Sequence, residues 1–162
     1  MRPTVVPAWR KKNFVQCLAS FGFAGPCYRL WKCVRTLTVL INRRIDDVYN
    51  FLVNPANLAR WTLLGPGQAA PEKGPLAWNF EGPYGNVLVR FTPANPYYVL
   101  DYSLQSGPHV WQSSSVRLIR NGSGCVLTHT SVQQPLVSDA AFESDEEWLQ
   151  SDLLVLKTLL ER

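Results

Sequence analysis

The chain has 162 residues, of which 46% are hydrophobic and 12% aromatic, so it can bury a substantial core and wholesale disorder is excluded. Nine of the sixteen Lys and Arg residues precede residue 45, and all twelve acidic residues follow it. The segment 45–162 therefore carries a formal charge of −5, from seven basic and twelve acidic residues, although the whole chain carries +4. A body of this charge lacks the basic face that binds phosphates, so we predict no nucleic-acid partner.

The four cysteines indicate neither a metal site nor a disulfide framework. Cys17, Cys27, Cys33 and Cys125 form no CxxC pair and have no histidines at zinc-site spacing. We therefore expect free thiols in a reducing compartment, no metal and no cofactor. The apolar-leaning stretch 13–28 is shorter than the roughly 20 residues that span a bilayer, so no transmembrane segment is predicted.

Residues 1–34 form a basic leader without acids, with several aromatic residues among its positive charges. This composition is typical of an organellar transit peptide, a membrane-surface contact or a partner-binding arm. An upstream start codon that extends a domain beginning near Arg35 explains it equally well. We expect a single domain, 35–162, in a cytoplasmic protein, or in an organellar one if the leader is a transit peptide.

This domain is expected to begin with a strand and two short helices. Residues 35–42 alternate between polar and apolar side chains, as in a half-buried strand. Apolar side chains recur at helical spacing in 45–53, and Pro55 suits the first position of a second short helix, 56–60.

A series of antiparallel strands joined by short turns is expected next. The loop 64–75 is rich in Gly and Pro, which suits a lid over a pocket, although most such loops only connect. Turn residues then separate five predicted strands: 76–81, 84–91, 97–105, 110–120 and 125–134. The strongest hairpin signal is Asn121-Gly122, because this pair tolerates the positive φ angles of a primed turn.

A long amphipathic helix, 138–160, is predicted to close the chain. Its leucines keep the three-to-four spacing of one apolar face, which Trp148 extends. Ser138 is suited to cap the start, and the acidic residues of the first half and Lys157 near the end match the helix dipole. Sheet and helix can share one core if the sheet curls, so we predict an α+β helix-grip fold, a curved antiparallel sheet wrapped around the C-terminal helix.

Two segments, together with the order of these elements, resemble the START-like helix-grip superfamily, also called SRPBCC, and in particular its polyketide cyclase and lipid-transport branch. The segments are IDDVYNFLVNPANLARW, 45–61, and EWLQSDLLVLKTLLE, 147–161. The resemblance covers about 35–161 and implies a ligand held between the sheet and the C-terminal helix. Members bind lipids, hormones or polyketides and only some are enzymes, so the resemblance is more specific for fold than for function.

The expected pocket would be lined by one face of each strand and by the apolar face of the helix. Alternation places Tyr98, Leu100, Tyr102 and Leu104 on one face, but the sequence does not decide whether that face is the inner one. The candidate ligand-binding residues are Trp78, Arg90, Tyr98, Tyr102, Trp111, Arg117, His129, Leu149, Leu153 and Leu156. All of them are equally intelligible as ordinary core or surface residues.

The two arginines among these candidates fall on strands that neighbour Glu81 and Asp101. Cross-strand pairs on the solvent face are therefore the default expectation. If Arg90 or Arg117 points inward instead, it would orient a polar group of the ligand, at the cost of burying a charge.

Catalysis would require a titratable group near neutrality, and His129 and Tyr102 are the candidates. His129 lies in an alternating strand, so it faces either the pocket or water. His109 follows Gly107-Pro108 and is expected in a solvated turn. A serine triad could be assembled from Ser113–Ser115, His129 and Asp101, but no Gly-x-Ser-x-Gly elbow supports it.

The leading hypothesis is binding or transport of a small hydrophobic ligand, a lipid or a polyketide-like molecule, without turnover. One alternative is an enzyme of the polyketide cyclase or dehydratase type. Another is an interaction module of the co-chaperone type, which would use a surface groove and have a solid core.

Overall fold

The computed structural model describes residues 32–106, 111–135 and 137–162. In these ranges the strands are β1 (Val34–Ile41), β2 (Gly67–Ala69), β3 (Ala77–Gly82), β4 (Gly85–Phe91), β5 (Tyr102–Ser106), β6 (Trp111–Asn121) and β7 (Gly124–Val132). The helices are α1 (Ile45–Leu52) and α2 (Asp139–Leu160), with short 3₁₀ helices η1 (Pro55–Arg60) and η2 (Pro71–Lys73). The predictions for Cys17, Cys27, His109 and almost all of the leader 1–34 lie outside the described residues.

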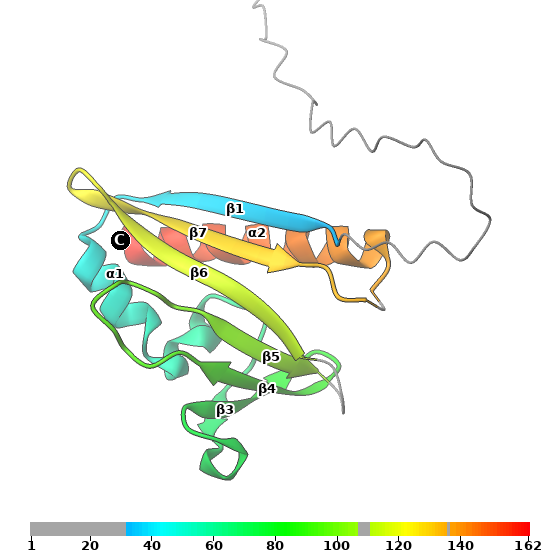
Figure 1. The fold of residues 1–162 in the computed structure, drawn as a ribbon. Helices are drawn as coiled ribbons and strands as arrows, with labels where there is room; N and C mark the ends of the chain where they lie inside the picture. The colour runs from blue at the N-terminus through cyan, green and yellow to red at the C-terminus, as the bar shows by residue number, and fades with distance from the viewer. Residues whose placement is uncertain (1–31, 107–110, 136) are drawn as a thin grey trace, which may run out of the picture. The chain divides into compact units, whose positions relative to one another are not determined.

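The seven described strands form one antiparallel sheet in the order β1-β7-β6-β5-β4-β3-β2. The first strand thus pairs with the last, and the others follow as a meander. Figure 1 shows the twisted sheet with α2 along β1 and β7 and with α1 next to β6. The predicted α+β helix-grip fold is confirmed. No helix in the described part of the chain is long and apolar enough to cross a bilayer.

Strand register decides which face of the sheet meets the helices. Residues opposite each other in an antiparallel pair point to the same face. Val39, Leu127 and Leu118 lie opposite one another across β1, β7 and β6, and all three are buried. This inner face also carries His129 and Ser131, which follow Leu127 at every second position of β7.

A dry core fills the space between this inner face, α1 and the C-terminal half of α2. Its buried apolar residues are Val39, Ile41, Ile45, Val48, Tyr49, Trp61, Val116, Leu118, Cys125, Leu127, Leu153, Leu156 and Leu160. The three leucines supply the stripe that the helical spacing predicted. Apolar burial contributes about 25 cal/mol per Å², so this cluster is the main source of stability.

Three local predictions are confirmed by the backbone and its caps. The Ala141 N–H donates to Ser138 Oγ at 3.2 Å, so Ser138 caps α2. Asn54 Oδ1 accepts from the Ala56 N–H at 3.1 Å, which caps η1 with Pro55 in its first turn. Gly122 has a φ of 59° in the hairpin between β6 and β7, as the turn chemistry requires.

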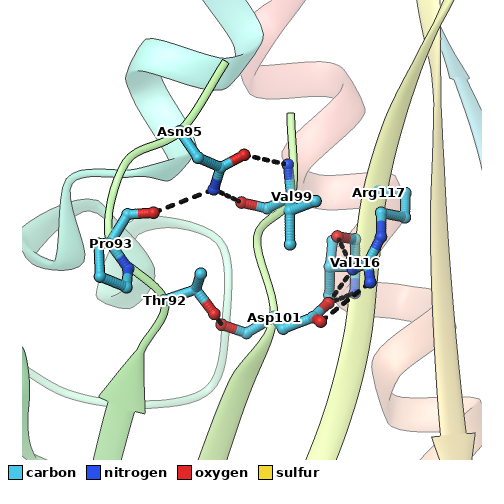
Figure 2. A network of polar contacts seen from close by, with 7 residues as sticks. All are labelled: Thr92, Pro93, Asn95, Val99, Asp101, Val116 and Arg117. Atoms are coloured by element: carbon cyan, nitrogen blue, oxygen red, sulfur yellow. Dashed lines mark hydrogen bonds and ion pairs between the residues drawn. The ribbon is translucent and has the colours of Figure 1, made fainter. Parts of the chain in front are cut away.

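The predicted strand 97–105 is wrong in its first half, because β5 begins only at Tyr102. The residue Tyr98 has a φ of 55°, which is incompatible with an extended strand. Asn95 holds the preceding turn. Its Oδ1 accepts the Val99 N–H at 3.2 Å, and its Nδ2 donates to the carbonyls of Pro93 and Val99 (Figure 2).

Asp101 anchors the end of the same segment to β6. Its carboxylate accepts the Val116 N–H at 2.8 Å and pairs with the Arg117 guanidinium, and its carbonyl accepts from the Thr92 hydroxyl (Figure 2). In this segment, side chains therefore form hydrogen bonds with backbone groups that are paired strand to strand in the regular parts of the sheet.

The loop 64–75 contains structure that its composition did not predict. Residues 67–69 form the edge strand β2, in which Gly67 lies opposite Phe80 of β3. A Cβ at Gly67 would collide with the Phe80 ring, so this close approach requires glycine. Residues 67–69 of the loop therefore extend the sheet, while Leu64 at its start and Leu63 just before it contribute to the site described below.

Candidate functional site

A cavity of about 310 Å³ lies between the sheet and residues 145–152 of α2. Each of four strands contributes two inner-face residues to its wall: Val87 and Val89, Tyr102 and Leu104, Gln112 and Ser114, His129 and Ser131. The helix contributes Asp145, Glu146, Trp148, Leu149 and Asp152. Leu58, Pro83 and residues 61–64 complete the wall.

Small residues in the sheet explain why this space is not filled. Ser114 and Ser131 lie opposite each other on β6 and β7, and both are buried. Farther along the same two strands, Leu118 lies opposite Leu127 and both side chains fill the core. The change from a leucine pair to a serine pair leaves room between the sheet and the helix.

A second cavity of about 40 Å³ adjoins the first. The two share four lining residues, Leu58, Trp61, Tyr102 and His129. The rest of the small cavity is mainly apolar, with Leu100, Leu127 and Leu153 among its walls. Tyr102 and His129 therefore lie at the boundary between the larger cavity and the apolar core.

The side chains of these two residues form a hydrogen-bonded pair. The Tyr102 hydroxyl is 2.9 Å from His129 Nε2, and Ser131 Oγ is 3.3 Å from Nδ1. Burial lowers the pKa of His129 to about 4 and raises the pKa of Tyr102 to about 12. At neutral pH the phenol keeps its proton and can donate to the neutral ring, whose Nδ1–H can then donate to Ser131.

The helix side of the cavity is acidic. Burial raises the pKa of Asp152 to about 6, and it raises the pKa values of Asp145 and Glu146 as well. Glu146 is only 8% exposed, and its Oε2 has no hydrogen-bond partner within the described residues. No Lys or Arg of the described chain lines this cavity.

Five of the sequence-predicted residues are distributed between the two cavities and the core. Tyr102, His129 and Leu149 line the larger cavity. Leu153 lines the smaller one, while Leu156 is fully buried in the core.

Two predicted aromatic residues face inward but pack away from the cavity. Trp78, opposite Val89, stacks on Phe80 with ring centroids 6.1 Å apart. Tyr98 packs edge-on against Tyr49 at 5.3 Å, and its hydroxyl donates to Asp46 at 2.7 Å.

The prediction that Arg90, Trp111 and Arg117 line the pocket is corrected by the strand register, which places all three on the outer face. The Arg90 guanidinium lies 4.2 Å from the Trp111 ring centroid, and Arg117 pairs with Asp101. The cross-strand pair of Arg117 on the solvent face, which was the default expectation, is confirmed. Because both arginines lie on the outer face, neither charge is removed from water.

Sequence reasoning missed most of the polar wall. Ser131 follows His129 at strand spacing, while Glu146 and Asp152 lie three residues before and after Leu149, on the same side of the helix. These spacings could have identified them. The carboxylates were instead attributed to the helix dipole.

The described residues contain no group of three or more His, Cys, Asp or Glu side chains that could hold a metal ion. Cys33 and Cys125 are free thiols.

No protein-family model and no curated protein sequence matches this chain. Solved structures do match. A START superfamily protein from Mycobacterium smegmatis is 13% identical with a TM-score of 0.61, over 79% of this chain and 97% of the other. The protein XoxI from Bacillus cereus is 16% identical with a TM-score of 0.66, over 79% and 95%.

The Aha1 dimer from Colwellia psychrerythraea gives 16% identity and a TM-score of 0.63, over 80% of this chain and 96% of that one. These matches span nearly the whole length of the solved chains. At such low identity they establish a shared fold, and that fold is the START-like helix-grip fold that the sequence resemblance indicated.

Proposed function

We propose that the protein binds a small hydrophobic molecule, such as a lipid or a polyketide-like compound, in the cavity between the sheet and α2. The observation that carries this proposal is the cavity itself. Its volume of about 310 Å³ lies within the roughly 300–1,000 Å³ of typical ligand pockets. Its walls combine apolar side chains with a few polar groups, which is the usual composition of such pockets.

Two exposed apolar side chains mark the entrance. Leu63 is 57% exposed and Trp148 is 48% exposed, although both line the cavity. A ligand that enters between them would remove this apolar surface from water together with its own. Val87, Val89 and Leu104 then contact its body, and burial at about 25 cal/mol per Å² drives binding.

The protonation states of the paired residues favour binding over turnover. A general acid or base works best with a pKa near the operating pH. His129, with a pKa of about 4, and Tyr102, with a pKa of about 12, are both far from neutrality because they are buried. We assign them to orienting the ligand by hydrogen bonds.

An enzyme of the cyclase or dehydratase type is the second candidate, on the strength of one other residue. Burial raises the pKa of Asp152 to about 6, a value suited to proton transfer near neutrality, and Asp152 lines the cavity. The third candidate, an interaction module of the co-chaperone type, was expected to have a solid core. The cavity inside the protein gives that candidate no support.

The test uses the full chain purified from cells. Native mass spectrometry should detect a retained small molecule, and the neutral dye N-phenyl-1-naphthylamine should fluoresce more strongly when it is bound. The matched variants are Ser114→Leu, which fills the cavity, and Ser113→Leu, which adds the same volume on the exposed outer face. Loss of ligand and dye in the first variant only is the expected result. Equal retention in both variants would contradict the proposal.

A further inference from the structure

We infer that the preferred ligand carries a cationic nitrogen, such as a protonated amine, at the end that meets Glu146 and Asp152. This inference rests on the proposed function, because it specifies the chemistry of the molecule that occupies the same cavity. It follows from an unpaired buried oxygen, from the sign of the charges in the wall and from the aromatic rings beside them.

The unpaired oxygen is Oε2 of Glu146. The side chain faces the cavity from α2 and is more than nine-tenths buried, yet this atom has no donor among the described residues. Hydrogen bonding to Ser131 lowers the pKa of this carboxyl against the effect of burial, but Oε2 itself has no donor in the described part of the chain. A buried acceptor without a donor is costly, and a ligand that brings an N–H removes that cost.

Charge complementarity selects a cation over other donors. Asp145, Glu146 and Asp152 all line the cavity, and they are not balanced by a Lys or Arg in the described part of its wall. The sheet opposite contributes Tyr102 and His129, which burial keeps neutral at pH 7.

The positive charge that lowers the pKa of Glu146 is that of Arg35 on β1. Arg35 is paired with Glu143 of α2, with 3.8 Å between Nη2 and Oε1, and neither residue lines the cavity. The cavity therefore remains a site of net negative charge once its carboxyls ionise.

Aromatic rings stand in the same wall. Trp148 lies on α2 between the two carboxylates in sequence, and it lines the cavity together with Trp61 and with Tyr102 of the sheet. Ring faces attract cations, and organic ammonium groups are recognised in this way. The apolar side chains of β4 and β5 are left for the rest of the molecule, so the ligand is an apolar amine.

The experiment compares three probes that share one chain and differ in the head group: decylamine, 1-decanol and decanoate. Dissociation constants are measured on the full chain at pH 7.5 by displacement of N-phenyl-1-naphthylamine. We expect decylamine to bind at least about tenfold more tightly than 1-decanol, as a charge-assisted hydrogen bond would provide, and decanoate to bind most weakly.

Two neighbouring glutamates provide the variant and its control. Glu146→Gln should reduce the preference for decylamine over 1-decanol by about tenfold. Glu147→Gln removes the same charge from an exposed residue that does not line the cavity, and should change the preference by less than about twofold. If Glu146→Gln does not fold, as thermal unfolding would reveal, Asp152→Asn must shift the preference in the same direction.

The outcomes separate this inference from the proposed function. Equal binding of decylamine and 1-decanol, or an unchanged preference in both Glu146→Gln and Asp152→Asn, overturns the cationic ligand but leaves a cavity for apolar molecules. A loss of preference in Glu147→Gln as large as in Glu146→Gln shows surface attraction and also overturns it. Failure of all three probes to displace or bind overturns the inference and the proposed function together.

Discussion

The two ends of α2 pack on the same sheet but have different roles, one in the core and the other in the wall of the cavity. In the C-terminal half, Leu156 and Leu160 pack into a dry core against α1 and the sheet. Nearer the N-terminus of the helix, at residues 145–152, Glu146 and Asp152 face a cavity across from two buried serines. One helix therefore supplies stability at one end and a site at the other.

The difference lies in the side chains that face each other, and the backbone is continuous through both halves. The leucine pair of β6 and β7, Leu118 and Leu127, fills the space at one end, and the serine pair, Ser114 and Ser131, leaves it empty at the other. A helix-grip fold thus acquires a cavity by the choice of residues at a few opposed positions.

The largest effect is expected at the core end. Leu156→Ala should lower the free energy of unfolding by about 2–5 kcal/mol, because it deletes buried methyl groups and leaves a void. Denaturant unfolding measures it. Leu154→Ala, on the exposed side of the same helix, is the control and should cost far less. If Leu149→Ala at the cavity costs as much as Leu156→Ala, the two halves do not differ as described.

Acid should weaken the folded state through His129. Burial lowers its folded-state pKa to about 4 from an ordinary 6.5, so between these values the unfolded chain takes up a proton that the folded chain refuses. Stability is lost as the pH falls through this window, by about 3 kcal/mol in all. Asp152 acts in the opposite direction over part of this range, so the loss is measured as the difference between the wild-type and His129→Gln unfolding curves from pH 7 to pH 4. His129→Gln should flatten that slope, and an unchanged slope would show that another group is responsible.

The variant Tyr102→Phe tests whether the hydrogen bond between Tyr102 and His129 stabilises the protein. Tyr102→Phe leaves His129 Nε2 without its partner and should cost about 1–2 kcal/mol, with weaker binding of hydrogen-bonding ligands. Tyr84→Phe makes the same change on a tyrosine that is 96% exposed and should be neutral in thermal unfolding. Equal effects of the two changes would mean that the pair contributes nothing.

The smallest expected effect is an increase in thermal stability, in the variant Asp152→Asn. Burial raises the folded-state pKa of Asp152 to about 6, so the neutral form is favoured on folding, and the stability that this contributes is lost as the pH rises through 6. Asp152→Asn mimics the neutral form and should raise the melting temperature at pH 8, with little change at pH 4. A larger gain at pH 4 than at pH 8 would reverse the sign of this argument.

Much of the fold was predictable because local chemistry and tertiary packing agree. The leucine spacing of α2, the Ser138 cap and the Asn121-Gly122 hairpin are each specified by neighbouring residues. β5 was predicted too long, because the side chains of Asn95 and Asp101 accept backbone N–H groups before Tyr102, and the partner of Asp101, the Val116 N–H, lies on another strand.

The site was predictable only in part, because alternation along a strand does not say which face is the inner one. Tyr102 and His129 were identified, whereas Arg90, Trp111 and Arg117 fell on the outer face. The carboxylates of α2 suit both the helix dipole and a cavity wall, and only the packing of the helix on the sheet distinguishes these roles.

Anomalous X-ray diffraction from a crystal of the full chain with a brominated apolar ligand, 10-bromo-1-decanol, tests the central claim most directly. We predict a bromine peak between Leu104 of β5 and Leu149 of α2, inside the cavity. A peak on the outer face of the sheet, or an unoccupied cavity at ligand concentrations that displace the dye in solution, would contradict the account.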